Sequence, residues 1–308
     1  MELKTNKINS IEPKSINVSD KKGKKKKYKH KRKMTKPERV TLWLSRIFIW
    51  ASILIILFPV LAIVTASLST GSSFIQKELI PSEITFDNYI YVLKETDFLL
   101  WVWNSFKVCF FVAAAQVLMT LPAAYTFSRL RFTGKKYGLM SLLILQMFPA
   151  SMALPAILSI SYRLNGMDNH FFLILVMCGA SAYNIWLMKG FIDGIPKELD
   201  ESALVDGANH NQIFRKIIFP LCKPMLVVIF FFSFIGTFGE FVLSAALLKD
   251  PSLKTLVIGL KSFMDSGVST NWTAYAAASV MATIPLAILF VSIQKFVSKG
   301  LVAGAVKE

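Results

Sequence analysis

Cysteine and histidine are scarce in this sequence, which has three residues of each among 308. Cys109, Cys178 and Cys222 are odd in number, far apart in the chain and placed within or beside apolar segments. This pattern excludes a disulfide framework and the close spacing of zinc ligands, so we expect three small apolar packing residues. The histidines do not cluster with the cysteines or with acidic residues, so the sequence has neither a metal-ligand set nor a Ser–His–acid pattern.

The sequence also has no glycine-rich phosphate-binding loop of the Gly-x4-Gly-Lys-Ser/Thr type. The chain is therefore not expected to be an enzyme that hydrolyses ATP, and no cofactor is expected within it. Any transport that it performs must draw its energy from a partner or from a gradient.

Acidic residues are outnumbered, with 19 Asp and Glu against 35 Lys and Arg, for a formal net charge of +16. The imbalance is concentrated in residues 1–40, whose net charge is +11 and leaves only +5 for the remainder. The run Lys21–Lys36 has almost no apolar residue and cannot bury a core, so a disordered tail is expected over 1–40. Only Tyr28 interrupts this charge with an aromatic ring, which argues against nucleic-acid binding and favours a topology signal in contact with membrane lipids.

Long apolar blocks dominate the rest of the chain, and they raise the hydrophobic content to 54% and the mean hydropathy to +0.52. A block of about 20 apolar residues can cross the roughly 30 Å hydrocarbon core of a bilayer. The sequence therefore predicts an all-α integral membrane protein in which residues 41–308 form a transmembrane domain of six helices. The predicted spans cover about residues 44–68, 102–125, 139–161, 171–191, 225–248 and 275–296.

The stretch between the fourth and fifth spans, residues 195–220, is too polar to cross a membrane and is patterned as two short helices. Pro196 suits a first helical turn, where its missing N–H costs little, and the acidic residues after it favour a helix N-terminus. Leu199 and Ala203 are four residues apart and so share one face. Gly207 is expected to end this helix in the left-handed conformation.

A second helix is predicted directly after Gly207. Asn209 is placed to cap it, with Gln212 three residues later as in a capping box. Apolar residues then recur at helical spacing, and we expect this helix to stop before Pro220.

This stretch resembles the EAA loop in the permease subunits of ABC importers, whose pattern is Glu-Ala-Ala, three residues, Gly, nine residues, Ile, one residue and Leu-Pro. Here the pattern is Glu201-Ser202-Ala203, then Gly207, Ile217 and Phe219-Pro220. The two departures from the family pattern, at Ser202 and Phe219, keep size or apolar character. The resemblance implies a type I ABC importer permease fold, in which this loop is a cytoplasmic coupling helix that docks into a cleft on the ATP-hydrolysing subunit. The residues implied to make that contact are Leu199, Glu201, Ser202, Ala203, Asp206 and Gly207.

Four other segments resemble the carbohydrate branch of the same family. Ala123–Phe132 is similar to the end of the second core helix of carbohydrate permeases, and Gln146-Met147-Phe148-Pro149 to their third-span signature. Gly239-Glu240-Phe241 stands where those proteins often carry Asn-Glu-Phe. The C-terminal segment Gly300–Lys307 resembles the end of the smaller permease subunit of maltose/maltodextrin importers. That likeness implies contacts with the ATPase at Gly300, Leu301 and Gly304.

The family likeness also implies an assembly and a mechanism. It implies a heterodimer with a second permease subunit, two copies of an ABC ATPase that bind ATP and Mg, and an extracytoplasmic solute-binding protein. Transport would proceed by alternating access in the plasma membrane of a bacterium. The placement of cations independently predicts that both termini and the 195–220 helix pair lie on the cytoplasmic side.

Other classes of function remain open from the sequence. An ABC permease for an amino acid or a phosphonate is the nearest alternative to a sugar permease. A secondary transporter would need intramembrane ion ligands and often internal repeats, and a membrane-embedded enzyme would need convergent catalytic groups. Glu240 is the one acidic residue within a predicted span. It either lines the translocation path near the outer mouth or lies capped or water-facing at the end of the fifth span.

Overall fold

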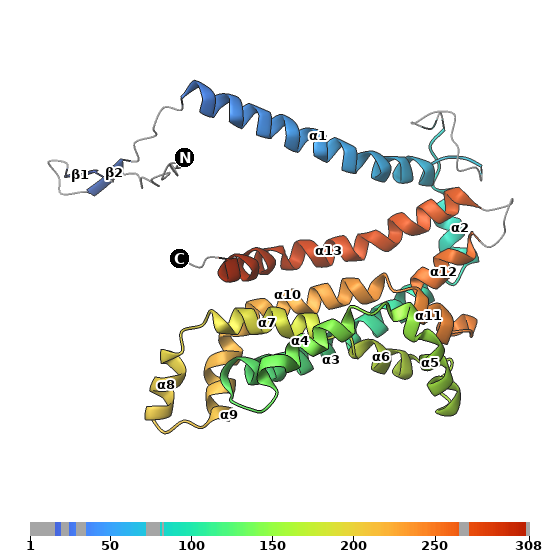
Figure 1. Cartoon of the computed structure of the whole chain (residues 1–308). Coiled ribbons are helices and arrows are strands. Elements are labelled where there is room, and N and C mark those ends of the chain that lie inside the picture. Colours follow the sequence, from blue (N-terminus) through green and yellow to red (C-terminus); the bar gives the residue numbers. More distant parts are fainter. Residues whose placement is uncertain are drawn as a thin grey trace, which may run out of the picture. The chain divides into compact units, whose positions relative to one another are not determined.

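A computed structural model describes residues 16–19, 25–28, 35–71, 81, 83–264 and 271–305 of the chain. These residues fall into two units, Met1–Val60 and Leu61–Glu308, and each is described by itself (Figure 1). In the first unit, β1 (Ile16–Ser19) and β2 (Lys25–Tyr28) pair antiparallel. A strand pair thus occupies part of the tail for which disorder was expected, although only Ile16 and Val18 of β1 and Tyr28 of β2 are residue types that favour strands. The rest of that tail, up to residue 34, lies outside the described residues.

Helix α1 (Lys36–Ser67) begins earlier than the domain boundary expected at residue 41. The reason is local, since the Thr35 backbone N–H donates to the Glu38 carboxylate (2.7 Å), which satisfies one of the unpaired donors at a helix start. Pro59 lies inside the helix without ending it. The apolar side chains of α1 are almost all exposed, as a helix that faces lipid requires.

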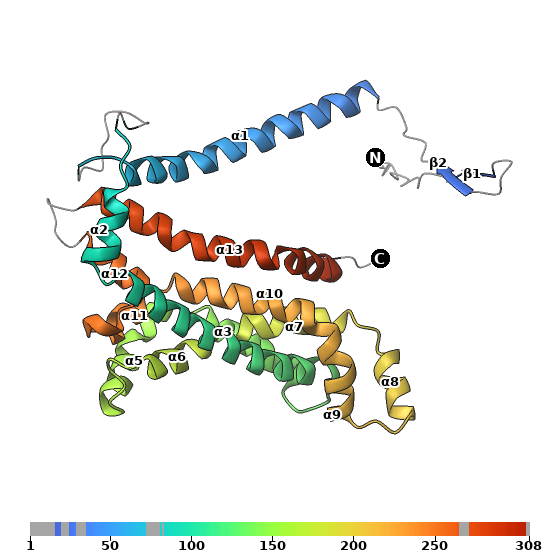
Figure 2. The same cartoon turned by 180° about the vertical axis from the view of Figure 1, so that it is seen from behind.

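The second unit is built around α3 (Phe98–Arg129). This helix packs against α10 (Phe219–Phe238) and against α7 (Ala182–Asp193), and α10 packs in turn against α13 (Trp272–Ala305) (Figures 1 and 2). Its first half also contacts α6 (His170–Cys178). Cys109, Cys178 and Cys222 are all free and buried, which confirms the packing role expected for them.

Four helices of the described residues are long and apolar enough to cross a membrane, or five if the bent pair α6 and α7 counts as one span. The sequence predicted six. The third predicted span is interrupted at Pro149, which separates α4 (Lys135–Gln146) from α5 (Ala150–Arg163). Pro149 lacks a backbone N–H and restricts the residue before it, so a continuous helix is broken there.

The fifth predicted span differs from the structure at both ends. Its helix is continuous from α9 (His210–Ile213) through a π-helical turn, η1 (Phe214–Ile218), into α10, so the stop expected before Pro220 is wrong. The wider turn closes with a bond from the Phe219 N–H to the Phe214 carbonyl, and such a π turn relieves the clash that proline otherwise causes. At the other end α10 stops at Phe238 rather than near residue 248.

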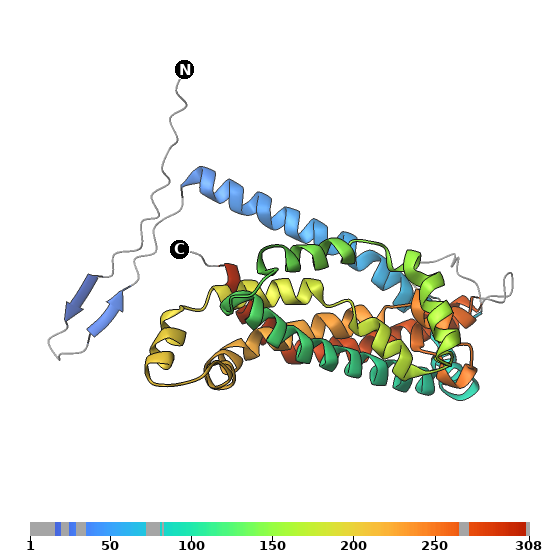
Figure 3. The same cartoon turned by 60° about the horizontal axis from the view of Figure 1, so that its bottom comes forward.

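The remaining helices lie at the two ends of this unit. Figures 1 and 3 show α8 and α9 beyond one end of α3, α7 and α10, together with the carboxyl end of α13. The opposite end carries α2, α5, α11 and α12. The elements not yet given bounds are α2 (Asp87–Glu95), α8 (Glu198–Val205), α11 (Val242–Leu247), η2 (Pro251–Leu253) and α12 (Leu256–Ser262).

Candidate functional site: a capped loop and a polar cavity

Helix α8 ends at Gly207 as the sequence predicted. Gly207 has φ +82°, and a side chain there would meet only open space, so its left-handed backbone alone calls for glycine. The Gly207 N–H donates to the Leu204 carbonyl (3.0 Å) and the Ala208 N–H to the Ala203 carbonyl (2.9 Å). These two bonds are the pair that defines a Schellman cap.

The start of α9 is also confirmed. The Gln212 N–H donates to Asn209 Oδ1 (2.9 Å), and the Asn209 N–H donates to Gln212 Oε1 (2.8 Å). The Schellman cap includes Ala208 and the capping box begins at Asn209, so the turn between α8 and α9 is fixed from both sides.

The residues expected to couple to a partner lie on different faces of α8. Val205 is 88% exposed, and Leu199 and Leu204 are more than two-fifths exposed. Ala203 is half-buried and packs, with Ala208, against the apolar core formed by the ends of α3, α7 and α10. Four other residues expected to contact the ATPase are also exposed: Glu201, Ser202, Asp206 and Gly207.

A buried ion pair, which the sequence analysis did not identify, ties α8 to α3. Arg129 Nε lies 2.5 Å from Asp200 Oδ2, and the two side chains are 6% and 13% exposed. The Arg129 Nη2 group also donates to the Ile195 carbonyl (2.7 Å), at the approach to α8. One arginine at the end of α3 therefore holds both the start of the loop and the inner face of its first helix.

A second set of contacts joins the end of α3 to α7. Ser128 Oγ donates to Asp193 Oδ1 (2.6 Å), and Lys189 Nζ donates to the other oxygen of that carboxylate (2.5 Å). Lys135 Nζ donates to the Ser128 carbonyl (3.0 Å), which adds the start of α4. The sequence shows a cation-rich segment at the end of α3 and acidic residues in and before α8. Their spacing does not show which cation meets which acid in the folded chain.

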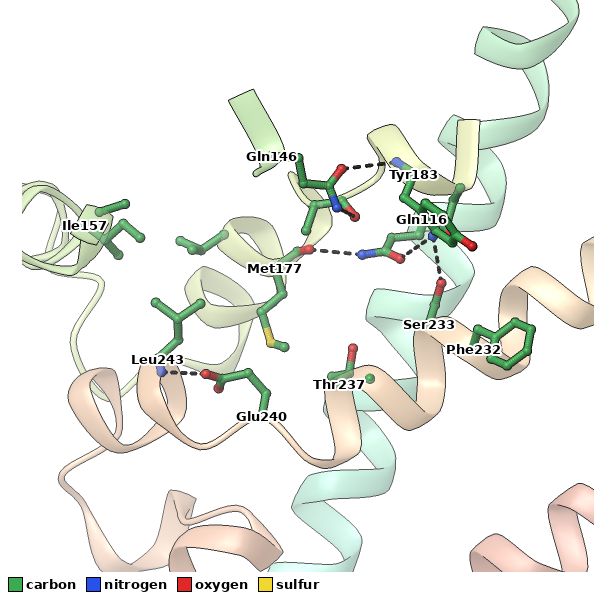
Figure 4. A pocket seen from close by; sticks show the side chains of 15 residues that line it. Gln116, Gln146, Ile157, Met177, Tyr183, Phe232, Ser233, Thr237, Glu240 and Leu243 are labelled. Atoms are coloured by element: carbon green, nitrogen blue, oxygen red, sulfur yellow. Dashed lines mark hydrogen bonds between the residues drawn. The ribbon is translucent and has the colours of Figure 1, made fainter. Parts of the chain in front are cut away.

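Within the bundle, a cavity of about 450 Å³ opens between α3, α4, α5, α6, α7 and α10 (Figure 4). We call it the polar cavity. Its wall carries amides, hydroxyls and one carboxylate among apolar side chains, and Figure 4 shows Met177 reaching between Glu240 and Thr237. The full lining is Gln116, Gln146, Ala153, Ile157, Val176, Met177, Ala180, Tyr183, Asn184, Phe232, Ser233, Gly236, Thr237, Glu240 and Leu243.

Three buried polar side chains form a network on this wall. Asn184 Nδ2 donates to Gln116 Oε1 (3.0 Å) and to Ser233 Oγ (3.1 Å), and Gln116 Nε2 donates to the Met177 carbonyl (3.1 Å). The network joins α3, α7 and α10 near the middle of α3. The sequence signal for this site is the presence of polar residues inside predicted spans, and none of these three residues was predicted as a site residue.

Glu240 lies in the break between α10 and α11 and not within a span. Its Oε1 accepts from the Leu243 N–H (2.7 Å), and its Oε2 accepts from the Ser244 N–H (2.9 Å) and the Ser244 hydroxyl (2.8 Å). The carboxylate therefore caps α11, as one of the two interpretations drawn from the sequence has it, and it also lines the polar cavity.

The C-terminal residues implied to contact an ATPase are only partly described. Gly300, Leu301 and Gly304 lie in the last turns of α13, where the structure describes the helix and not the side chains. Residues 306–308 lie outside the described residues.

Residues 110–302 match the family described as the binding-protein-dependent transport system inner membrane component. The chain belongs to this family. Its relatives are membrane permease subunits of ABC transporters.

The alignments with named relatives of this inner membrane component cover nearly the whole length of each relative. The galactooligosaccharides transport system permease protein GanQ of Bacillus subtilis (strain 168) is 39% identical over 255 residues, which cover 82% of this chain and 90% of GanQ. The maltose/maltodextrin transport system permease protein MalG of Escherichia coli (strain K12) is 34% identical over 291 residues, which cover 88% of this chain and 98% of MalG.

Two solved structures share the fold. A bacterial ABC transporter involved in the import of the acidic polysaccharide alginate matches with a TM-score of 0.72 at 24% sequence identity, over 85% of this chain and 98% of that chain. The MetNI methionine ABC transporter matches with a TM-score of 0.53 at 19% identity, over 66% of this chain and 95% of that chain. From α1 onward the described residues therefore have the helical fold of an ABC importer permease.

Proposed function

We propose that this chain is a permease subunit of an ATP-driven importer for a sugar or oligosaccharide. The observation that carries the proposal is the identity of 34–39% with GanQ and MalG over more than four-fifths of the chain. The polar cavity supports it, because amide and hydroxyl groups set among apolar side chains are suited to a ligand rich in hydroxyl groups.

We further propose that α8 is the coupling helix that docks on an ATPase subunit. Leu199, Leu204 and Val205 are exposed apolar side chains on a short polar helix, and such exposure favours burial against a partner. The buried pair of Arg129 and Asp200 lets a displacement of α8 act on α3 as one body. ATP-driven closure of the ATPases would then move α3 and the helices packed on it, giving alternating access at the polar cavity.

The assembly follows from the same proposal. A second permease subunit, two copies of an ABC ATPase that bind ATP and Mg, and an extracytoplasmic binding protein complete the importer. The carboxyl end of α13 lies at the same end of the second unit as α8, which supports an ATPase contact through Gly300–Lys307 (Figures 1 and 3). Both termini and α8 would then face the cytoplasm of a bacterial cell, as the cation-rich tail favours.

The test is uptake by the whole complex in proteoliposomes supplied with its binding protein and ATP. We expect uptake of a labelled neutral oligosaccharide and none of a labelled amino acid or phosphonate; the reverse preference would overturn the sugar assignment.

Gly207→Pro should abolish uptake and ATPase co-purification, because proline forbids the left-handed backbone and removes the N–H that donates to the Leu204 carbonyl. Gly207→Asn is the control and should retain both, since asparagine tolerates this conformation. Full uptake by Gly207→Pro would remove the coupling role of α8.

A further inference from the structure

We infer that the polar cavity of this chain is a subsite for a neutral sugar unit and rejects an anionic one. The inference rests on the proposed function and narrows it to one class of substrate and one place in the fold. Three observations support it: the hydrogen-bonding groups on the wall that have no partner, the charges around the cavity, and the open space beside Gly236.

The first observation concerns polar groups left free by the network. The bonds that Asn184 Nδ2 and Gln116 make hold both amides in fixed orientations. Asn184 Oδ1 and the Thr237 hydroxyl have no hydrogen-bond partner in the part of the chain that the structure describes, although both residues are more than nine-tenths buried. Both residues line the cavity, so these two groups are suited to the donors and acceptors of sugar hydroxyls.

The second observation concerns charge. No Lys, Arg or His is among the residues that line the cavity, and its single charged side chain is Glu240. The N-terminus of α11, which could otherwise attract an anion, is already taken by that carboxylate. A carboxylate on a sugar would therefore enter an uncompensated site next to a like charge, whereas a neutral sugar unit would not.

The contrast with the alginate transporter makes this inference specific. That importer carries an acidic polysaccharide, and the two chains share a fold at 24% identity. If similarity of fold decided the substrate, this chain would also be expected to transport an acidic polysaccharide. The charges of the lining residues argue against that extension.

The third observation supplies the experiment. Gly236 lines the cavity from α10, and a Cβ there would meet no atom within 4 Å, so Gly236→Leu starts from open space and extends an apolar side chain from the cavity wall. Gly190 is a matched control, because it also lies in a helix interior, also has open space at its Cβ position, and does not line the cavity. Thr237→Val is the milder variant, since it replaces an unpartnered hydroxyl by a methyl group of similar shape.

Binding is measured by equilibrium dialysis on the purified permease–ATPase complex without its binding protein, using radiolabelled maltotriose and its acidic counterpart trigalacturonate. We expect saturable binding of maltotriose to the wild-type and Gly190→Leu complexes, roughly tenfold weaker binding to Gly236→Leu, and no saturable binding of trigalacturonate. Thr237→Val should weaken maltotriose binding with no fall in the melting temperature, which a purely structural hydroxyl would not do.

The outcomes separate this inference from the proposed function. Equal maltotriose binding by Gly236→Leu and Gly190→Leu, or no saturable binding by the wild type, would overturn the subsite while uptake of sugar by the complete importer still stands. Binding of trigalacturonate as tight as that of maltotriose would overturn the preference for neutral sugars. Failure of the complete wild-type importer to take up any sugar would instead remove the proposed function itself.

Discussion

Asp200 is the one acidic residue of α8 that faces inward, and its only ion-pair partner within the described residues is Arg129. In the sequence, Asp200 stands with Glu198 and Glu201 among the acids that favour a helix N-terminus. Helical spacing separates the faces of α8, but it does not reveal which acid meets a cation from a distant helix. The motif therefore predicts where the loop lies in the sequence, whereas the tertiary structure is needed to show that Asp200 binds the loop to α3.

Removing the charge of Asp200 should detach α8 from α3. Asp200→Asn keeps the shape of the side chain and leaves the Arg129 guanidinium buried without a counter-ion, a change that costs about 3–5 kcal/mol for buried pairs. We expect weak co-purification of the ATPase and a large loss of uptake, measured together with the melting temperature of the complex. Glu198→Gln removes an exposed carboxylate from the same helix and should change each quantity little. Equal behaviour of the two variants would show that the ion pair does not hold the loop.

At the scale of elements, helix ends that depend on local chemistry were predictable and those that depend on packing were not. The Gly207 cap and the Asn209 box follow from a few adjacent residues, and both are confirmed. The helix continues through Pro220 by way of a π turn, and it ends at Phe238, just before Glu240, whose carboxylate caps the next helix, α11. Hydropathy averages over such features, because the residues on both sides of each are apolar.

Glu240 provides a test at this scale, because cap and substrate contact predict different effects. Glu240→Gln keeps one acceptor for the α11 donors, whereas Glu240→Ala leaves donors from Leu243 and Ser244 unpaired. If the cap is the main role, we expect Gln to lower stability by about 1 kcal/mol and Ala by about 1–3 kcal/mol, with uptake falling in the same order. Melting temperature and initial uptake rate, measured on the same preparations, check this. Equal loss of uptake in both variants at unchanged melting temperature would instead assign the carboxylate to the translocation path.

At the scale of the whole molecule, the number of spans depends on the broken pair α4 and α5. Each is too short to cross a membrane, so hydropathy alone supports five spans among the described residues. Their outer ends are nevertheless fixed at opposite ends of the second unit. Lys135 bonds to the carbonyl groups that end α3, while Asp168, after α5, accepts from the Lys249 and Asp250 N–H groups beyond α11. Together α4 and α5 run the length of α3, which favours a sixth crossing broken at Pro149.

Cysteine labelling with a membrane-impermeant thiol reagent distinguishes the two topologies, and the buried native cysteines keep the background low. In a six-span permease with α8 in the cytoplasm, Glu95→Cys and Arg163→Cys should react in intact cells. Lys136→Cys and Val205→Cys should react only after permeabilisation, and all four positions are exposed on the chain. An Arg163→Cys variant that reacts only in permeabilised cells would make α4 and α5 a re-entrant pair and reduce the spans to five. Reaction of Val205→Cys in intact cells would place α8 outside, where no ATPase could reach it, and the coupling proposal would fail.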